Sequence, residues 1–273
     1  MIRIVTSLVL TVFFFLALFL DPIWWLLFIL IFAVAGGIEF ANVLYKGKLF
    51  ALRVLVIAAC FAFPANAYMQ HNGFPALPDM LVVALLFVFA PILFILSRGA
   101  VEDFHTSVPM VLYGSLWVGL LLSFTIHLRY VKLGPYHYGI HSILFLLLVV
   151  ATSDASAYYV GKAIGRHALS PLYSPKKTWE GSVAGYLGGL LIAYVSYFIW
   201  APQFTPLHTG IMAVLIVTFG QLGDLAQSVF KRSCKVKDAG DVLPGHGGVL
   251  DRLDAVLLAA PPFYWYIYYV LKG

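Results

Sequence analysis

Residues 79–97 read DMLVVALLFVFAPILFILS, and every residue between Asp79 and Ser97 is apolar. A helix needs about 20 mainly apolar residues to cross the hydrocarbon core of a bilayer. Because no water is available there to satisfy backbone polar groups, such a segment must be helical. This run therefore predicts a transmembrane helix.

The rest of the chain repeats this pattern. The candidate spans are residues 4–20, 23–41, 51–68, 79–97, 107–126, 139–160, 182–200, 210–230 and 249–271. The chain is 62% hydrophobic and only 11% charged, with a mean hydropathy of +0.93, which no ordinary soluble domain shows. We therefore expect an all-α, polytopic integral membrane protein with about nine transmembrane helices.

The basic residues predict how the chain is oriented in the membrane. Loops on the cytoplasmic side of a membrane are enriched in lysine and arginine. With nine spans, fourteen of the seventeen basic residues fall on one side, and the other side carries only Arg129, Lys132 and Lys272. The N-terminus is therefore predicted to be cytoplasmic.

The first apolar run could be read as a cleaved signal peptide. Its charged region is only Arg3, and a second apolar run follows directly after Asp21 and Pro22, so we expect a retained helix. The short N-terminal tail without an arginine-rich transit segment favours a prokaryotic plasma membrane, which is the cell inner membrane in a Gram-negative organism. The net charge of +5 is explained mostly by the cytoplasmic loops and does not imply binding of nucleic acid.

Ionisable residues are distributed unevenly between the two halves of the chain. Residues 1–135 supply five spans with few ionisable side chains besides Glu39. The spans within residues 136–273 carry four aspartates at or near their ends: Asp154, Asp224, Asp251 and Asp254. Because charged groups at membrane depth are costly and usually functional, we expect a scaffold at 1–135 and a catalytic half at 136–273.

The first long polar loop is GKAIGRHALSPLYSPKKTWEG at residues 161–181. Its lysines and hydroxyls are suited to an oligophosphate, because they supply charge-assisted donors and complete an anion-binding nest. The candidate binding residues are Ser174, Lys176, Lys177 and Thr178. The alternative is a positive-inside loop with no ligand, and the loop lacks the patterns of a P-loop or a Rossmann site.

The span that follows this loop begins with glycines four residues apart, at Gly181, Gly185 and Gly189. Glycines at this spacing share one helical face and allow close helix packing. We interpret these glycines as structural.

Two predicted helices bring carboxylates onto polar faces. Asp224 shares a face with Gln221, Ser228 and Lys231, which recur at intervals of three or four. The last span carries Asp251 three residues before Asp254, so those two also share a face.

These carboxylates allow two interpretations. Carboxylates, water and substrate phosphates together are the usual ligands of Mg²⁺ in phosphoryl-transfer sites. Alternatively, Asp251 and Asp254 pair with Arg252 or loop lysines and merely close the cytoplasmic face. The apolar sequence neighbours of Asp224 favour the metal.

Residues 228–254, SVFKRSCKVKDAGDVLPGHGGVLDRLD, resemble the signature of the phosphatidate cytidylyltransferases, also called CDP-diacylglycerol synthases. The matching residues are Ser228, Phe230, Lys231, Arg232, Lys237, Asp238, Gly240, Pro244, His246, Gly247, Gly248, Asp251, Arg252, Leu253 and Asp254. The stretches SDASAYYVGKAIGRH and SPKKTWEG also resemble polar segments of that family. The resemblance therefore covers at least residues 153–254.

The resemblance implies transfer of a cytidylyl group from CTP to phosphatidic acid, which gives CDP-diacylglycerol and pyrophosphate. It implies Mg²⁺ as the cofactor, leaves a second cation open, and suggests a homodimer in contact with membrane lipids. The metal ligands would be Asp224 and Asp251. The catalytic residues would be Asp224, Asp251, Lys231, Lys237 and Asp254. The substrate-binding residues would be Ser174, Lys176, Lys177, Thr178, Ser228, Arg232, Asp238, His246, Gly247, Gly248, Arg252 and Asp154.

Other functions fit parts of the pattern. A cytidylyltransferase or CTP-dependent kinase for another lipid, such as a polyprenol, would share the nucleotide site. A CDP-alcohol phosphotransferase would carry a D-G-x-x-A-R stretch, which is absent here. A cation-coupled transporter would need polar groups along a path to the outside, and the outer halves of the spans offer few. A catalytically inactive relative would not need the complete signature.

Overall fold

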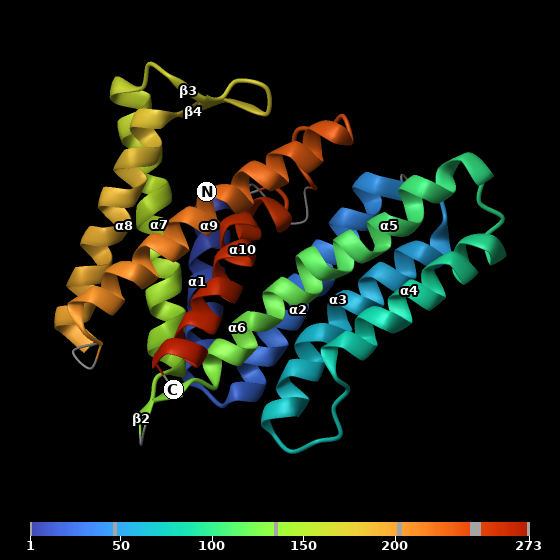
Figure 1. Ribbon diagram of the computed structural model, residues 1–273, viewed down its shortest axis with the longest axis horizontal. Helices are drawn as coiled ribbons and strands as arrows, with labels where there is room; N and C mark the ends of the chain where they lie inside the picture. Colours follow the sequence, from blue (N-terminus) through green and yellow to red (C-terminus); the bar gives the residue numbers. More distant parts are fainter. Residues whose placement is uncertain (1, 46–47, 134–135, 201–203, 241–246, 272–273) are drawn as a thin grey trace. The chain divides into compact units, whose positions relative to one another are not determined.

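The computed structural model describes residues 2–45, 48–133, 136–200, 204–240 and 247–271. The described chain is predominantly helical (Figure 1), which confirms the all-α prediction. It divides into two compact units. The first unit comprises Met1–His127 and Val236–Arg252, and the second comprises Leu128–Lys235 and Leu253–Gly273.

The first unit is built from the helices of the N-terminal half. They are α1 (Ile2–Phe19), α2 (Pro22–Tyr45), α3 (Phe50–His71), α4 (Asp79–Leu96), the short η1 (Val101–Asp103), α5 (Phe104–Gly114) and α6 (Leu121–Arg129). The π-helical turn η2 (Ser115–Leu120) joins α5 to α6. Residues 104–129 therefore follow one continuous helical path, which corresponds to a single predicted span.

Small residues let the helices of the first unit approach closely. A Cβ atom added at Gly114 would overlap the ring of Phe40, which is fully buried. A Cβ atom added at Gly119 would lie 2.9 Å from the Cα of Cys60. Glycines at such points allow neighbouring helix backbones to come together, so α2 and α3 pack against the helix of residues 104–129.

The second unit consists of the long helices of the C-terminal half and two short hairpins. The helices are α7 (Gly139–Ile164), α8 (Trp179–Trp200), α9 (Pro206–Ser233), α10 (Leu250–Tyr266) and the π-helical turn η3 (Ile267–Leu271). The antiparallel hairpins pair β1 (Lys132–Leu133) with β2 (Tyr136–His137), and β3 (Ala168–Ser170) with β4 (Ser174–Thr178). The first turn of α10, through Arg252, belongs to the first unit.

The glycine face of α8 has the structural role predicted for it. Gly181, Gly185 and Gly189 are buried, and Figure 1 shows α7 and α8 lying side by side. A Cβ atom at Gly185 would lie 3.0 Å from the Oγ of Ser153 on α7. The prediction of tight packing is confirmed, because no larger residue would fit between these helices.

Seven helices of the described chain are long and apolar enough to cross a membrane. They span Pro22–Tyr45, Phe50–His71, Asp79–Leu96, Val101–Arg129, Gly139–Ile164, Trp179–Trp200 and Pro206–Ser233. The first predicted span corresponds to the shorter apolar helix Leu8–Phe19, and the ninth to α10, which has 17 residues. The chain is therefore a multi-pass membrane protein, while nine crossings and a cytoplasmic N-terminus stay predictions.

Candidate active site

The polar loop between α7 and α8 is folded as the β3–β4 hairpin, which the sequence did not predict. Ala168 pairs with Thr178, and Ser170 pairs with Ser174. Glu180, in the first turn of α8, accepts hydrogen bonds from the Nδ1 of His167 at 2.6 Å and from its backbone N–H at 3.3 Å. Figure 1 shows the hairpin extending beyond the ends of α7 and α8. The hairpin is thus fixed to the start of α8.

The four hairpin residues predicted to bind phosphate differ in their surroundings. Thr178 accepts a hydrogen bond from the backbone N–H of Gly181 at 3.1 Å, as an N-cap side chain does. Ser174 is half-buried, Lys176 is exposed and Lys177 is half-buried. Thr178 therefore has a structural role at the start of α8, and Lys177 is the lysine that faces the interior of the unit.

Lys177 forms an ion pair with Asp224. The Nζ of Lys177, on β4, contacts the Oδ2 of Asp224, on α9. The two side chains are 27% and 36% exposed, so water screens the pair less than it would at the surface. The pairing joins two residues 47 positions apart in the sequence, each of which was predicted to belong to the site.

Two more aspartates interact electrostatically with Asp224. Asp154, on α7, is repelled by Asp224 and attracted by Lys177. Asp254, on α10, is repelled by Asp224 and Asp154 and attracted by Lys231. We call Asp154, Asp224 and Asp254 the carboxylate cluster. The second unit thus gathers three of the four predicted intramembrane aspartates.

The helix backbones bring the cluster together. A Cβ atom added at Gly223 would overlap the carbonyl oxygen of Asp254, so α9 and α10 are in close contact beside Asp224. One turn earlier on α9, Gln221 accepts a hydrogen bond from Ser182 on α8 at 2.5 Å and donates one to its carbonyl at 3.2 Å. On the predicted polar face of α9, Gln221 therefore contacts α8 and Asp224 contacts β4.

The other predicted metal ligand, Asp251, lies in the first unit. Its Oδ2 accepts a hydrogen bond from the backbone N–H of Ala239 at 3.0 Å. The buried carboxylate of Glu39 accepts hydrogen bonds from the backbone N–H groups of Val249 and Leu250. We call residues 247–250 the glycine turn. The sequence offered one indication that Glu39 matters, because the N-terminal spans contain few other ionisable side chains.

The remaining predicted residues are distributed over both units. Ser228 is half-buried on α9, and Arg232 is exposed near the end of that helix. Lys237, Asp238 and Arg252 are exposed in the first unit. His246 lies outside the described residues. Because Asp224 and Asp251 belong to different units, their joint role as metal ligands stays a prediction.

The residues of the second unit suit a hard cation. In the part of the chain that the structure describes, no group of three or more His, Cys, Asp or Glu side chains could by itself hold a metal ion. Mg²⁺ usually keeps several waters and binds one or two carboxylates together with substrate phosphates. The chemistry of the carboxylate cluster fits this mode of binding, because its donors are oxygens whose mutual repulsion a cation would relieve.

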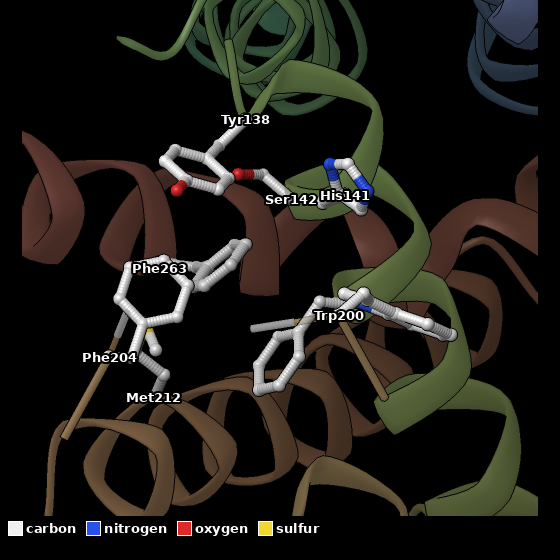
Figure 2. Close-up of a pocket in the computed structure, with 8 residues that line it drawn as sticks. Tyr138, His141, Ser142, Trp200, Phe204, Met212 and Phe263 are labelled. Atoms are coloured by element: carbon white, nitrogen blue, oxygen red, sulfur yellow. The ribbon is translucent and has the colours of Figure 1, made fainter. Parts of the chain in front are cut away.

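A small cavity of about 10 Å³ lies elsewhere in the second unit. Figure 2 shows Tyr138, His141, Trp200 and Phe263 among the side chains that line it. Its volume is about that of a single water site. On α7 the cavity is lined by His141, Ser142 and Phe145, whereas Asp154 lies nine residues beyond Phe145, about 14 Å further along the helix at about 1.5 Å per residue. It is therefore separate from the candidate active site.

The fold and the site define a polytopic membrane protein that gathers three carboxylates from its helices and a lysine from the β3–β4 hairpin. The sequence matches the model of the cytidylyltransferase family over residues 1–270. The chain therefore belongs to the cytidylyltransferase family.

Individual relatives carry a more specific name. A phosphatidate cytidylyltransferase of Haemophilus influenzae is 40% identical over 143 residues, which are 50% of this chain and 49% of the relative. One of Bacillus subtilis is 32% identical over 180 residues, 65% of each chain. One of Staphylococcus haemolyticus is 44% identical over 128 residues, 45% of this chain and 47% of the relative. The similarity thus spans about half to two thirds of the length of these relatives.

Proposed function

We propose that the protein transfers a cytidylyl group from CTP to phosphatidic acid and so forms CDP-diacylglycerol and pyrophosphate for phospholipid biosynthesis. The observation that carries this proposal is the Lys177–Asp224 pair within the carboxylate cluster, in a chain of the cytidylyltransferase family. The names of the relatives support phosphatidic acid as the acceptor.

In the proposed reaction, a phosphate oxygen of the lipid attacks the α-phosphorus of CTP. A new phosphorus–oxygen bond forms while the bond from the α-phosphorus to the bridging oxygen of pyrophosphate breaks. Both substrates are anions, so the protein must hold them in line and neutralise their charge. We assign this task to Lys177, Lys231 and Lys237. The lipid phosphate is already deprotonated, so no strong general base is needed.

We also propose that Asp224 and Asp251 bind Mg²⁺, with Asp254 as a further ligand or a support for Asp224. When bound, the metal would neutralise charge on the substrate phosphates. The repulsion between Asp224 and Asp254 supports this assignment. Like charges brought together in a partly buried site are costly unless a cation accompanies them.

The proposed site faces the cytoplasm of a cell whose plasma membrane holds the protein. CTP is a multiply charged cytosolic nucleotide that does not cross a bilayer, so the residues that bind it belong on the cytoplasmic side. The lipid substrate would then arrive from the inner leaflet, with its acyl chains remaining among lipids. The concentration of lysines and arginines in the loops around the site supports this orientation.

The test is Mg²⁺-dependent formation of CDP-diacylglycerol by the purified protein from CTP and phosphatidic acid. We expect product with the wild type and loss of product with Asp224→Asn or Asp251→Asn. Full activity of either variant would remove that carboxylate from the mechanism. Turnover with another lipid phosphate, but none with phosphatidic acid, would contradict the proposed substrate and retain the nucleotide chemistry.

A further inference from the structure

Glu39 connects the N-terminal half of the sequence to the signature segment. It lies on α2 and is only 2% exposed. Its Oε1 accepts a hydrogen bond from the backbone N–H of Val249 at 2.9 Å, and its Oε2 accepts one from Leu250 at 3.0 Å. Leu250 is the first residue of α10. Since the first N–H groups of a helix have no partner within that helix, the Glu39 carboxylate acts as a cap supplied by another helix.

The backbone around the cap is shaped to admit this carboxylate. A Cβ atom added at Gly240 would lie 2.8 Å from the Oε1 of Glu39. A Cβ atom added at Gly248 would lie 2.9 Å from the Oε2 of Glu39 and 3.1 Å from the Oδ2 of Asp251. A side chain at either position would therefore displace the Glu39 carboxylate, and at Gly248 the added Cβ atom would also lie 2.9 Å from the backbone nitrogen of Gly240.

The capped turn carries Asp251. This residue follows Leu250 directly, and its own carboxylate is held by the backbone N–H of Ala239. We propose that Glu39 is a positioning residue: by fixing the first turn of α10, it sets the orientation of the Asp251 carboxylate for nucleotidyl transfer. This inference rests on the proposed function, in which Asp251 binds the metal.

The role requires a carboxylate and not merely a polar side chain. Glutamate presents two acceptor oxygens, one for each backbone N–H, and its charge is favoured near a helix N-terminus. Glutamine has nearly the same shape but only one acceptor, so its NH₂ group would face a second donor. Glu39→Gln therefore removes one hydrogen bond of the cap while leaving the packing volume almost unchanged.

A matched control is available in the same unit. Asn66, on α3, is a buried polar residue that accepts a hydrogen bond from Leu77 at 2.9 Å and donates one to Asp79 at 2.7 Å. Asn66→Ala should lower the thermal stability of the first unit without touching the glycine turn. It therefore measures what general destabilisation does to activity.

The experiment combines a structural readout with kinetics. In Glu39→Gln we expect faster hydrogen–deuterium exchange in peptides covering residues 239–255, about a tenfold lower kcat, and a higher Mg²⁺ concentration for half-maximal activity. Asn66→Ala should change none of these three quantities.

Unchanged hydrogen–deuterium exchange in Glu39→Gln would contradict the proposal that Glu39 caps α10. Faster exchange with wild-type kcat and Mg²⁺ dependence would overturn the positioning role. A wild type inactive with CTP and phosphatidic acid would instead overturn the proposed function, since the exchange result does not depend on turnover.

Discussion

The carboxylate cluster of the second unit and the Glu39 cap of the first unit hold their carboxylates with different partners and at different depths. Asp224 is paired with the flexible side chain of Lys177 and remains partly exposed. Glu39 is bonded to two backbone N–H groups and is almost fully buried. A lysine side chain can exchange one anion for another, whereas backbone donors stay where the fold puts them. The comparison separates groups suited to meet substrates from groups suited to hold the site in place.

The largest expected effect is that of Asp224→Asn. This substitution keeps the shape of the side chain but removes the charge that pairs with Lys177 and, in our proposal, binds the metal. We expect CDP-diacylglycerol formation to fall by about 10³-fold or more. Asp103→Asn, at an exposed position of the first unit, should retain wild-type activity. Comparable losses in the two variants would contradict a specific role for Asp224.

Substitution of the two neighbouring hairpin lysines compares the charge of the half-buried Lys177 with that of the exposed Lys176. We expect Lys177→Met to lower kcat/KM for CTP by about 10²-fold, because it removes a positive charge from a partly screened site. Lys176→Met removes the same charge from an exposed side chain and should cost far less. Steady-state kinetics at fixed ionic strength measure both. Equal losses would indicate that only the total charge of the hairpin matters.

Gly248→Ala tests the Glu39 cap, in which backbone N–H groups hold the carboxylate. The added methyl group would press on the carboxylates of Glu39 and Asp251, so we expect a loss of about 1–3 kcal/mol in the free energy of unfolding together with reduced activity. The control is Gly220→Ala on α9, where the added atom would make only ordinary contacts at 3.7 Å or more. Thermal unfolding should show no loss of stability there, since alanine favours helix over glycine. A neutral Gly248→Ala would refute the tight fit.

The smallest effect is expected at the base of the hairpin. Glu180→Gln weakens the contact with His167, which is exposed. Ion pairs at the surface contribute little because solvent screens them, so kcat/KM should stay within about twofold of the wild type. A large loss of activity would show that the tie between hairpin and α8 helps to place Lys177. Comparing kcat/KM at low and high salt would then separate the effect of the lost charge of Glu180 from that of the weakened hydrogen bond to His167.

Local pattern explains why much of the site could be predicted. Asp224, Gln221 and Lys231 recur at helical spacing, and such spacing fixes which residues share a face whatever the neighbours are. The glycines of α8 were predictable for the same reason. The β3–β4 hairpin was not, because its polar residues carry no alternation of apolar and polar side chains, which is the usual sign of a strand. Thr178 was assigned to phosphate, and its contact with Gly181 as a helix cap was missed.

The sequence by itself determined that this protein is a multi-pass helical membrane protein, and its signature segment indicated the family and most of the candidate residues. Hydropathy and helical periodicity depend only on residues close together in the sequence, so they can be recognised without knowledge of the fold. Only the tertiary structure decided that Lys177 pairs with Asp224 and that Glu39 caps a helix that begins 211 residues further along. Those partners are distant in the sequence, so only the packing of the folded chain brings them together; at Gly248, for example, an added Cβ atom would lie 2.9 Å from the Glu39 carboxylate.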